Sequence, residues 1–174
     1  AAEGKIPGTV AVNLSPVQFG RDDLADTIHA ILLETGLSPR RLEVEVTGST
    51  IMSDQSRGLH ILRKLKAMGI SVSMDDFGTG YSSLATLHAF PFDKIKLDQS
   101  FVKRLPEDAA AAAIVRTVLA LGASLGMPVL AEGIETEAQW QFLADAGCAN
   151  GQGYLFARPA SLGQLPAAID AAAP

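Results

Sequence analysis

The sequence predicts an α/β fold of the barrel type, and three observations lead to this prediction. The chain has 174 residues, 48% of them apolar, which is enough for one domain with a hydrophobic core. Short apolar segments alternate with amphipathic helical stretches and carry no hairpin signals, a pattern typical of parallel strands with helices outside them. Several strands also have one polar side, whereas strands buried on both faces read as continuous apolar runs.

Six strands are expected, at residues 9–14, 42–46, 70–74, 94–97, 128–134 and 151–156. In the second, Glu43 and Glu45 alternate with apolar residues, and the same alternation recurs in the third and fourth. The order of strands and helices alone leaves an open doubly wound sheet possible. The alternation favours a barrel whose interior is lined by a functional site.

Three helices between these strands have apolar residues at helical spacing and a glycine that can end them. These residues are Leu24, Ile28, Ile31 and Leu32 before Gly36; Leu59, Leu62 and Leu65 before Gly69; and Trp140 and Leu143 before Gly147. Thr136 and Gln139 form a capping box at the start of the last one. The whole chain, 1–174, is expected to form one domain, with a frayed Ala-rich tail at 167–174.

The apolar stretch 109–131 carries a single charge, Arg116. Glycines and Pro128 interrupt it, so an amphipathic helix that runs into a buried strand is favoured over a membrane span. The apolar face of that helix is expected at Ile114, Val118, Leu121 and Leu125.

Composition argues against several classes of partner. The net charge is −5 with no basic run, which disfavours a nucleic-acid polymer or an anionic membrane surface. Cys148 is the only cysteine, so no intramolecular disulfide can form, and we expect this residue to be a packing residue. The sequence starts without a signal peptide, and we expect the segment to be cytoplasmic, which is compatible with a membrane anchor elsewhere in the parent protein.

Polar side chains stand at the carboxyl end of every expected strand, where barrel enzymes hold their active sites. They are Asn13, Glu45, Asp75 with Asp76, Lys96 with Asp98, Glu132, and Gln152. Oxygen ligands of this kind suit Mg²⁺ or Mn²⁺. The three histidines, His29, His60 and His88, are far apart in the sequence and indicate no zinc site. Two adjacent aspartates can contact two cations, which together can clamp a phosphodiester during its displacement.

Structural explanations of the same residues stay open at this point. Asp75 and Asp76, followed by Phe77-Gly78-Thr79-Gly80, could form a turn with helix-capping aspartates. Lys96 and Asp98 could form an ion pair with a purely structural role. Glu43, deeper on the same face as Glu45, is expected to be structural.

Six ordered motifs over residues 10–159 resemble the EAL domain, the bacterial phosphodiesterase that opens cyclic di-GMP. They are VNLS at 12–15, LEVEVT at 42–47, DDFGTGYSSL at 75–84, IKLDQSFV at 95–102, AEGIET at 131–136 and QGYLF at 152–156. The resemblance implies a TIM-type barrel that hydrolyses cyclic di-GMP to linear pGpG with two Mg²⁺ or Mn²⁺ ions.

The resemblance also implies roles for individual residues. Asn13, Glu45 and Asp75 match the ligands of one metal, and Asp75 and Asp76 match positions around the second. Lys96, Glu132, Gln152 and Asp76 match catalytic positions near the metals, the attacking water and the substrate. Phe77, Gly78, Thr79, Gly80, Tyr81 and Ser82 match a loop that links substrate, metal and dimerisation, and Asp98, Glu135 and Pro159 match further substrate or loop positions.

Two features depart from the family pattern. The Glu-Ala-Leu signature is absent, so one metal ligand is missing and the expected barrel is incomplete at its N-terminal side. Gly48 stands where the family has an acidic residue that braces the loop. The alternatives are therefore a degenerate EAL domain that binds cyclic di-GMP as a receptor, and a plain interaction module. Family membership further implies a homodimer and neighbouring signalling domains in the parent protein.

Overall fold

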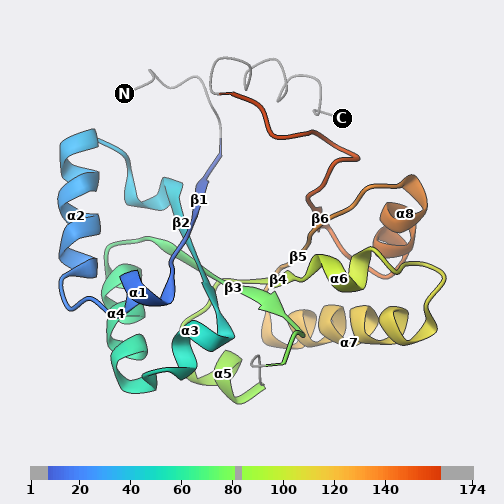
Figure 1. Cartoon of the computed structure of the whole chain (residues 1–174), viewed down its shortest axis with the longest axis horizontal. Coiled ribbons are helices and arrows are strands. Elements are labelled where there is room, and N and C mark those ends of the chain that lie inside the picture. The colour runs from blue at the N-terminus through green and yellow to red at the C-terminus, as the bar shows by residue number, and fades with distance from the viewer. Residues whose placement is uncertain (1–7, 81–83, 162–174) are drawn as a thin grey trace. The chain divides into compact units, whose positions relative to one another are not determined.

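The computed structural model describes residues 8–80 and 84–161, and the chain forms two compact units in it (Figure 1). The first unit spans Gly8–Lys96 and the second begins at Leu97. Tyr81, Ser82 and the tail at 167–174 lie outside the described residues. Within each unit the strands follow one another in sequence order, and the strand pairs whose register is defined are parallel. The predicted α/β fold with parallel strands is confirmed.

The first unit contains four strands and the helices that connect them. In chain order these elements are β1 (Val10–Asn13), α1 (Pro16–Phe19), α2 (Leu24–Thr35), the 3₁₀ helix Pro39–Arg41, β2 (Leu42–Thr47), α3 (Gly48–Met52), α4 (Gln55–Ala67), β3 (Ser71–Phe77), α5 (Leu84–Ala89) and β4 (Lys94–Leu97). In the register of the sheet Asn13 lies opposite Glu45, and Thr47 lies opposite Asp75. This register places the predicted site residues of neighbouring strands at the same end.

The core of the first unit lies between the strands and α4. Val44, Val46, Val72 and Met74 are buried on one side of β2 and β3, and α4 buries Ile61, Leu62 and Leu65. Asp54 starts α4 by accepting a hydrogen bond from the N–H of Arg57. The residues Glu43, Glu45, Ser73 and Asp75 alternate with the core valines and therefore lie on the opposite side of the strands.

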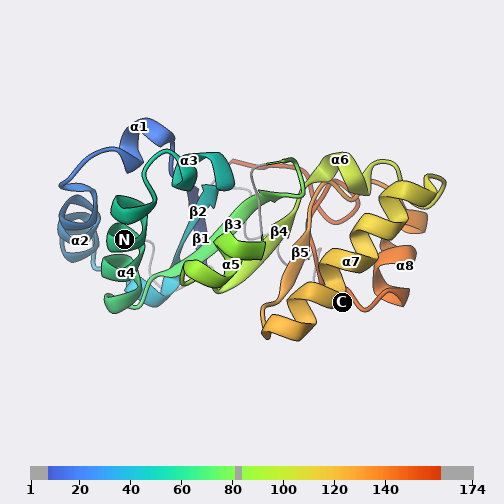
Figure 2. The same cartoon turned by 90° about the horizontal axis from the view of Figure 1, so that it is seen from below.

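The second unit contains α6 (Gln99–Val102), α7 (Ala109–Leu125), β5 (Val129–Ala131), α8 (Glu137–Asp145) and β6 (Asn150–Gly151). The predicted capping box of α8 is present, with Thr136 and Gln139 bonded reciprocally. Figure 2 shows α7 and α8 side by side, and the Arg116 guanidinium stacks 4.8 Å from the centre of the Phe142 ring.

The expected apolar face of α7 is wrong at two of its four residues, whereas Val118 is buried as expected. Ile114 and Leu125 are exposed, whereas Ala111, Val115, Val118, Leu119 and Gly122 form the buried face. The reason is close packing of small residues, because a Cβ on Gly122 would lie 2.5 Å from Val129 Cγ2. In the described part of the chain no helix is both long and apolar enough to span a bilayer.

The last expected strand is also much shorter than its apolar pattern indicated. Only Asn150–Gly151 pairs with β5, and the chain then turns, with the N–H groups of Phe156 and Ala157 donating to the Gly153 carbonyl. Similarly, β5 ends at Ala131, and Gly133 turns the backbone with φ of 70°. These two turns place Glu132 and Gln152 directly after the strand ends.

The carboxylate of Asp108 is expected to titrate below the usual range of an aspartate. Its pKa is lowered by a hydrogen bond from the N–H of Ala111 and by the Arg104 guanidinium. Because the folded-state pKa is the lower one, the stabilisation is present above pH 4 and is lost as the pH falls through the folded value. Carbon-detected NMR titration checks this, and Arg104→Gln should move the pKa back upward. An unchanged Asp108 pKa in Arg104→Gln would show that the guanidinium does not lower this pKa.

Candidate functional site

The first unit brings four predicted site residues together at the carboxyl ends of β1 to β4. They are Asn13, Glu45, Asp75 and Lys96, which we call the carboxylate cluster. Lys96 Nζ lies 2.5 Å from Glu45 Oε2 and 3.0 Å from Asp75 Oδ1. Only 5% of the Lys96 side chain is exposed, with 8% for Glu45 and 11% for Asp75. Lys96, Glu45 and Asp75 therefore form a buried network in which one ammonium serves two carboxylates, whereas Asn13 is exposed on β1.

Small side chains on β3 make this network possible. β3 lies between β2 and β4 in the sheet, and it presents Ser73 opposite Glu45. A lysine on β4 can therefore pass over β3 and reach the carboxylate on β2. The same relation recurs one layer deeper, where Lys94 Nζ lies 2.6 Å from Glu43 Oε2. Glu43 thus forms a structural ion pair, as expected, while its buried Oε1 has no hydrogen-bond partner among the described residues.

The Asn13 side chain completes the carboxylate cluster with an amide. One of its two terminal atoms lies 3.3 Å from Glu45 Oε2 and 3.1 Å from Asp75 Oδ2. With nitrogen in that place the amide donates to both carboxylates. With the amide turned over, its oxygen faces them, and three oxygens from three strands converge. Oxygen atoms in such an arrangement are the ligands that a hard divalent cation prefers.

Asp76 lies beside the cluster with an unusual backbone. Its φ is 53°, in the left-handed region that asparagine and aspartate adopt more readily than other residues with a side chain. Its N–H donates to Asp75 Oδ1, and its carbonyl accepts from Thr79 Oγ1. This turn thereby helps to fix the Asp75 carboxylate. Both aspartates belong to β3 and not to a helix start, so the alternative of helix-capping aspartates is wrong.

Of the remaining predicted loop, the structure describes Phe77, Gly78, Thr79 and Gly80, while Tyr81 and Ser82 lie outside the described residues. Phe77 is buried at the end of β3. Gly48 is also buried, as the first residue of α3 after the capping residue Thr47. Asp98 caps α6 by accepting a hydrogen bond from the N–H of Ser100, and Lys96 forms ion pairs with Glu45 and Asp75.

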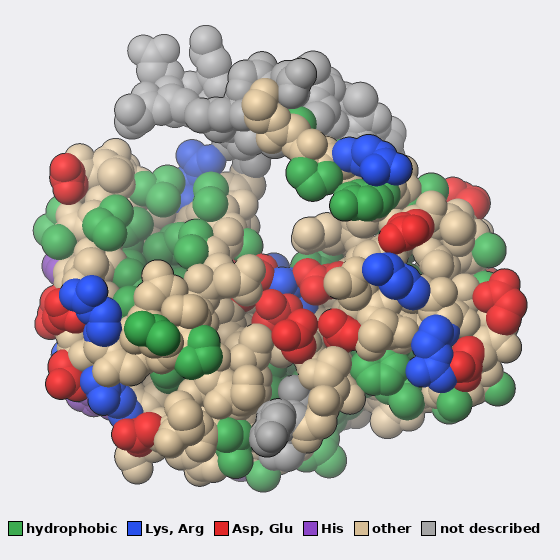
Figure 3. Space-filling model, in the orientation of Figure 1, with side chains coloured by type: hydrophobic (Ala, Val, Ile, Leu, Met, Phe, Trp, Pro, Cys, Tyr) green, Lys and Arg blue, Asp and Glu red, His purple; other side chains and the backbone are tan. Residues whose placement is uncertain are grey.

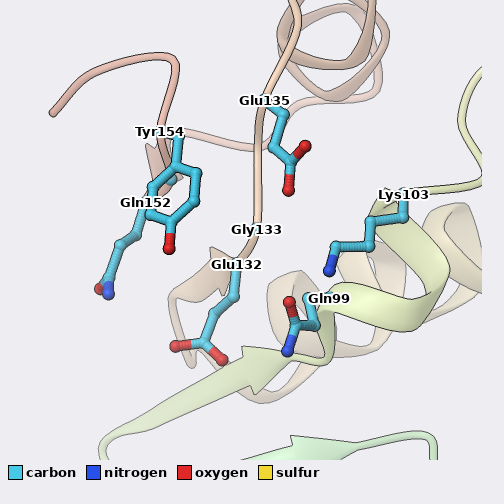
Figure 4. Close-up of a pocket in the computed structure, with 8 residues that line it drawn as sticks. Gln99, Lys103, Glu132, Gly133, Glu135, Gln152 and Tyr154 are labelled. Carbon is cyan, nitrogen blue, oxygen red and sulfur yellow. The ribbon is translucent and has the colours of Figure 1, made fainter. Parts of the chain in front are cut away.

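The second unit forms a polar pocket of about 270 Å³ that contains three further predicted residues (Figure 4). Its lining consists of Gln99, Lys103, Glu132, Gly133, Glu135, Gln152, Gly153 and Tyr154. Glu132, Glu135 and Gln152 were predicted from the sequence. Pro159 is exposed and does not line this pocket.

Two glycines allow the walls of this pocket to approach each other. A Cβ on Gly133 would lie 2.5 Å from Gln99 Cβ, and one on Gly153 would lie 2.1 Å from the Ile134 carbonyl oxygen. Backbone hydrogen bonds join the two turns, from Gln152 N–H to Ala131 O and from Ile134 N–H to Gln152 O. The glycines that follow Glu132 and Gln152 are therefore required by the packing of the pocket.

The charged side chains on the surface are distributed as expected for a sequence without a basic run. Figure 3 shows acidic and basic side chains interspersed, without a large basic patch on the face drawn. Among the described residues no three of the His, Cys, Asp and Glu side chains converge so as to hold a metal ion. The carboxylate cluster accordingly offers two carboxylates and one amide, and not a complete protein-only metal cage.

The family model of the EAL domain matches residues 2–159 of the chain. The chain belongs to the EAL domain family. Its six ordered motifs and its parallel strands with helices are therefore those of this family, and the recognition made from the sequence is confirmed.

Two EAL relatives show the extent of the similarity. An uncharacterized signaling protein of Caulobacter vibrioides is 53% identical over 95% of this chain. The bifunctional diguanylate cyclase/cyclic di-GMP phosphodiesterase MucR of Pseudomonas aeruginosa is 45% identical over 95% of this chain. The chain spans 20% and 24% of the lengths of these two relatives.

Solved EAL structures share the fold. The MucR phosphodiesterase in complex with cyclic di-GMP superimposes with a TM-score of 0.86 at 46% identity, covering 90% of this chain and 64% of that one. The manganese and cyclic di-GMP complex of BlrP1 from Klebsiella pneumoniae gives a TM-score of 0.81 at 35% identity, covering 90% of this chain and 39% of that one.

Sequence reasoning missed five residues of the pocket in this EAL chain, the glycines Gly133 and Gly153 and the side chains of Gln99, Lys103 and Tyr154. Gln99 and Lys103 lie four residues apart, at the start of α6 and just after its end, so the helix presents both to one side. A helix expected directly after β4 would have indicated that Gln99 and Lys103 lie on the same side. The sequence motif at 95–102 gave no such helix.

Proposed function

We propose that this EAL chain belongs to a metal-dependent phosphodiesterase that hydrolyses cyclic di-GMP to linear pGpG. The observation that carries the proposal is the carboxylate cluster, in which Glu45 and Asp75 share the Lys96 ammonium and the Asn13 amide lies within 3.3 Å of both carboxylates. The cyclic di-GMP complexes of MucR and BlrP1, which share the fold, support the choice of substrate.

The donor set of the cluster fits a hard divalent cation. Asn13, Glu45 and Asp75 would hold one Mg²⁺ or Mn²⁺, with waters in the remaining coordination positions, and Asp75 and Asp76 would hold a second. Bound cations would supply Lewis-acid stabilisation of the charge that develops on the phosphodiester oxygens. The manganese in the BlrP1 complex supports this assignment.

The protein's own groups would position the reactants. The two carboxylates hold the Lys96 ammonium in a fixed place, from which it can donate hydrogen bonds to an attacking water or to a phosphate oxygen. Glu132 and Gln152 follow the ends of β5 and β6 and line the pocket of the second unit, where they would orient water or substrate.

Hydrolysis by the whole protein tests this proposal. With Mg²⁺ or Mn²⁺ we expect linear pGpG as the product, resolved by liquid chromatography, and no turnover when a chelator is present. Asp75→Ala should lower kcat about a hundredfold or more, because it removes a shared cation ligand. The control Asp26→Asn changes an exposed aspartate on α2 and should keep full activity. Equal rates for the wild type and Asp75→Ala would overturn the proposal.

A receptor function is the second candidate, and Gly48 is the observation that favours it. This buried position provides no carboxylate to brace the loop after β3. In that case calorimetry would show cyclic di-GMP binding while the chromatograms show no pGpG. For both functions we propose a cytoplasmic location, a homodimer and neighbouring signalling domains, the last supported by the bifunctional description of MucR.

A further inference from the structure

We propose that Lys94 is a positioning residue that keeps the Lys96 ammonium in the carboxylate cluster. It does so by pairing with Glu43, a buried carboxylate that would otherwise compete for Lys96. The inference rests on the proposed function, which gives the Lys96 ammonium its role at the attacking water or at a phosphate oxygen. Lys94 itself touches neither substrate nor metal and acts only through the place of Lys96.

Two layers of side chains on the same side of β1 to β4 carry the argument. The layer at the carboxyl ends consists of Asn13, Glu45, Ser73 and Lys96, and the deeper layer consists of Ala11, Glu43, Ser71 and Lys94. Each layer has a glutamate on β2, a serine on β3 and a lysine on β4. The layers differ on β1, where Asn13 offers an amide and Ala11 only a methyl group. The deeper glutamate therefore lacks the second polar neighbour that Glu45 has.

Glu43 depends on Lys94 for its charge balance. Its side chain is 6% exposed, and its Oε2 lies 2.6 Å from Lys94 Nζ. Its other oxygen, Oε1, is buried and has no hydrogen-bond partner among the described residues. In the described part of the chain Lys94 is also its one ion-pair partner. A buried carboxylate that loses such a partner retains an uncompensated desolvation penalty, so it attracts any other cation within reach.

Lys96 is the cation within reach. Glu43 and Glu45 are two residues apart on β2, so they face the same side at a spacing of about 7 Å. The flexible stem of a lysine allows its ammonium to turn from one layer toward the other. Without the Lys94 charge, the three carboxylates of these ion pairs would share one ammonium. Lys96 would then leave its place beside Asp75, and a misplacement of about 1 Å at a reacting group can lower a rate about a hundredfold.

Kinetics of the whole protein with cyclic di-GMP test the inference. We expect Lys94→Met to lower kcat about tenfold or more while KM changes less than about threefold, because Lys96 acts on the reaction rather than on substrate binding. Glu43→Gln/Lys94→Met should recover kcat to within about threefold of the wild type, since the competing carboxylate is gone. Lys94→Arg keeps the charge and should likewise recover kcat. Lys64→Met, an exposed lysine on α4, is the matched control.

Crystal structures of the whole protein without metal give a readout that does not depend on activity. In Lys94→Met the Lys96 ammonium should lie within hydrogen-bond distance of the Glu43 carboxylate. In Glu43→Gln/Lys94→Met it should lie between Glu45 and Asp75, as in the wild type. If Lys94→Met does not fold, Lys94→Gln takes its place with the same expected results, because it keeps a hydrogen-bond donor to Glu43 without the charge.

The two readouts separate this inference from the proposed function. If the wild type hydrolyses cyclic di-GMP and Lys94→Met keeps either its kcat or the wild-type place of Lys96, the inference is overturned and the proposed function stands. A loss of kcat that Glu43→Gln does not reverse also overturns the inference, because a purely structural ion pair would explain it. If the wild type does not hydrolyse cyclic di-GMP, the proposed function fails, and the crystal structures alone decide whether Lys94 positions Lys96.

Discussion

Replacing Lys96 by methionine is expected to lower the free energy of unfolding by about 3–5 kcal/mol. Methionine keeps most of the side-chain volume but removes the ammonium that lies between Glu45 and Asp75. Two buried carboxylates would then face each other without a counter-ion, at a cost well above that of a surface ion pair, which is about 0–1 kcal/mol. Urea denaturation at neutral pH measures the difference.

A matched control comes from an exposed lysine. Lys64→Met on α4 makes the same chemical change and should alter stability by no more than about 0.5 kcal/mol. Saturating Mn²⁺ should restore part of the stability that Lys96→Met loses, because a cation at the two carboxylates replaces the missing charge. If the Lys96→Met protein is as stable as the Lys64→Met protein, the buried network does not contribute to the free energy of unfolding as described.

Replacing Gly153 by alanine is expected to destabilise the second unit by about 3 kcal/mol, the upper end of the usual cost of overpacking. The added Cβ would lie 2.1 Å from the carbonyl oxygen and 2.3 Å from the nitrogen of Ile134. Those atoms belong to the backbone that joins the turns after β5 and β6, so they cannot move aside like a flexible side chain. The pocket at Gln152 and Tyr154 should be displaced as well.

Gly147→Ala provides the comparison for this prediction. Gly147 has a φ of 88°, and no heavy atom lies within 4 Å of the place of a Cβ. The Gly147→Ala variant should therefore be destabilised by only about 1 kcal/mol, because alanine is strained in the left-handed backbone conformation. Thermal melts of both variants measure the contrast. A Gly153→Ala protein as stable as Gly147→Ala would show that the two turns are less closely packed than the structure has them.

Much of the fold could be predicted because strands leave a clear pattern in the sequence. The alternation in residues 42–46 gave β2 almost its full extent, and β4 has the expected bounds. The face of α7 was only partly found in this way, because its buried side includes Ala111 and Gly122, which carry little apolar signal, beside the apolar Val115, Val118 and Leu119. The strand expected at 151–156 ended early because of the contact between Gly153 and Ile134, which lie 19 positions apart in the sequence.

The candidate site was predictable to a similar degree. Strand ends pointed to Asn13, Glu45, Asp75 and Lys96, and the structure joins these four in one network. That Lys96 pairs with Glu45 across β3 could not be predicted, because it depends on the strand order and on a serine between them. The roles of the predicted site residues, including Glu132 and Gln152, remain predictions.

A Mn²⁺ titration followed by electron paramagnetic resonance tests the central claim most directly, since it counts bound ions at the proposed site without requiring turnover. For the whole protein, the account predicts saturable Mn²⁺ binding that Asp75→Asn weakens about tenfold or more and that Asp26→Asn leaves unchanged. Identical Mn²⁺ binding by the wild type and Asp75→Asn would contradict it.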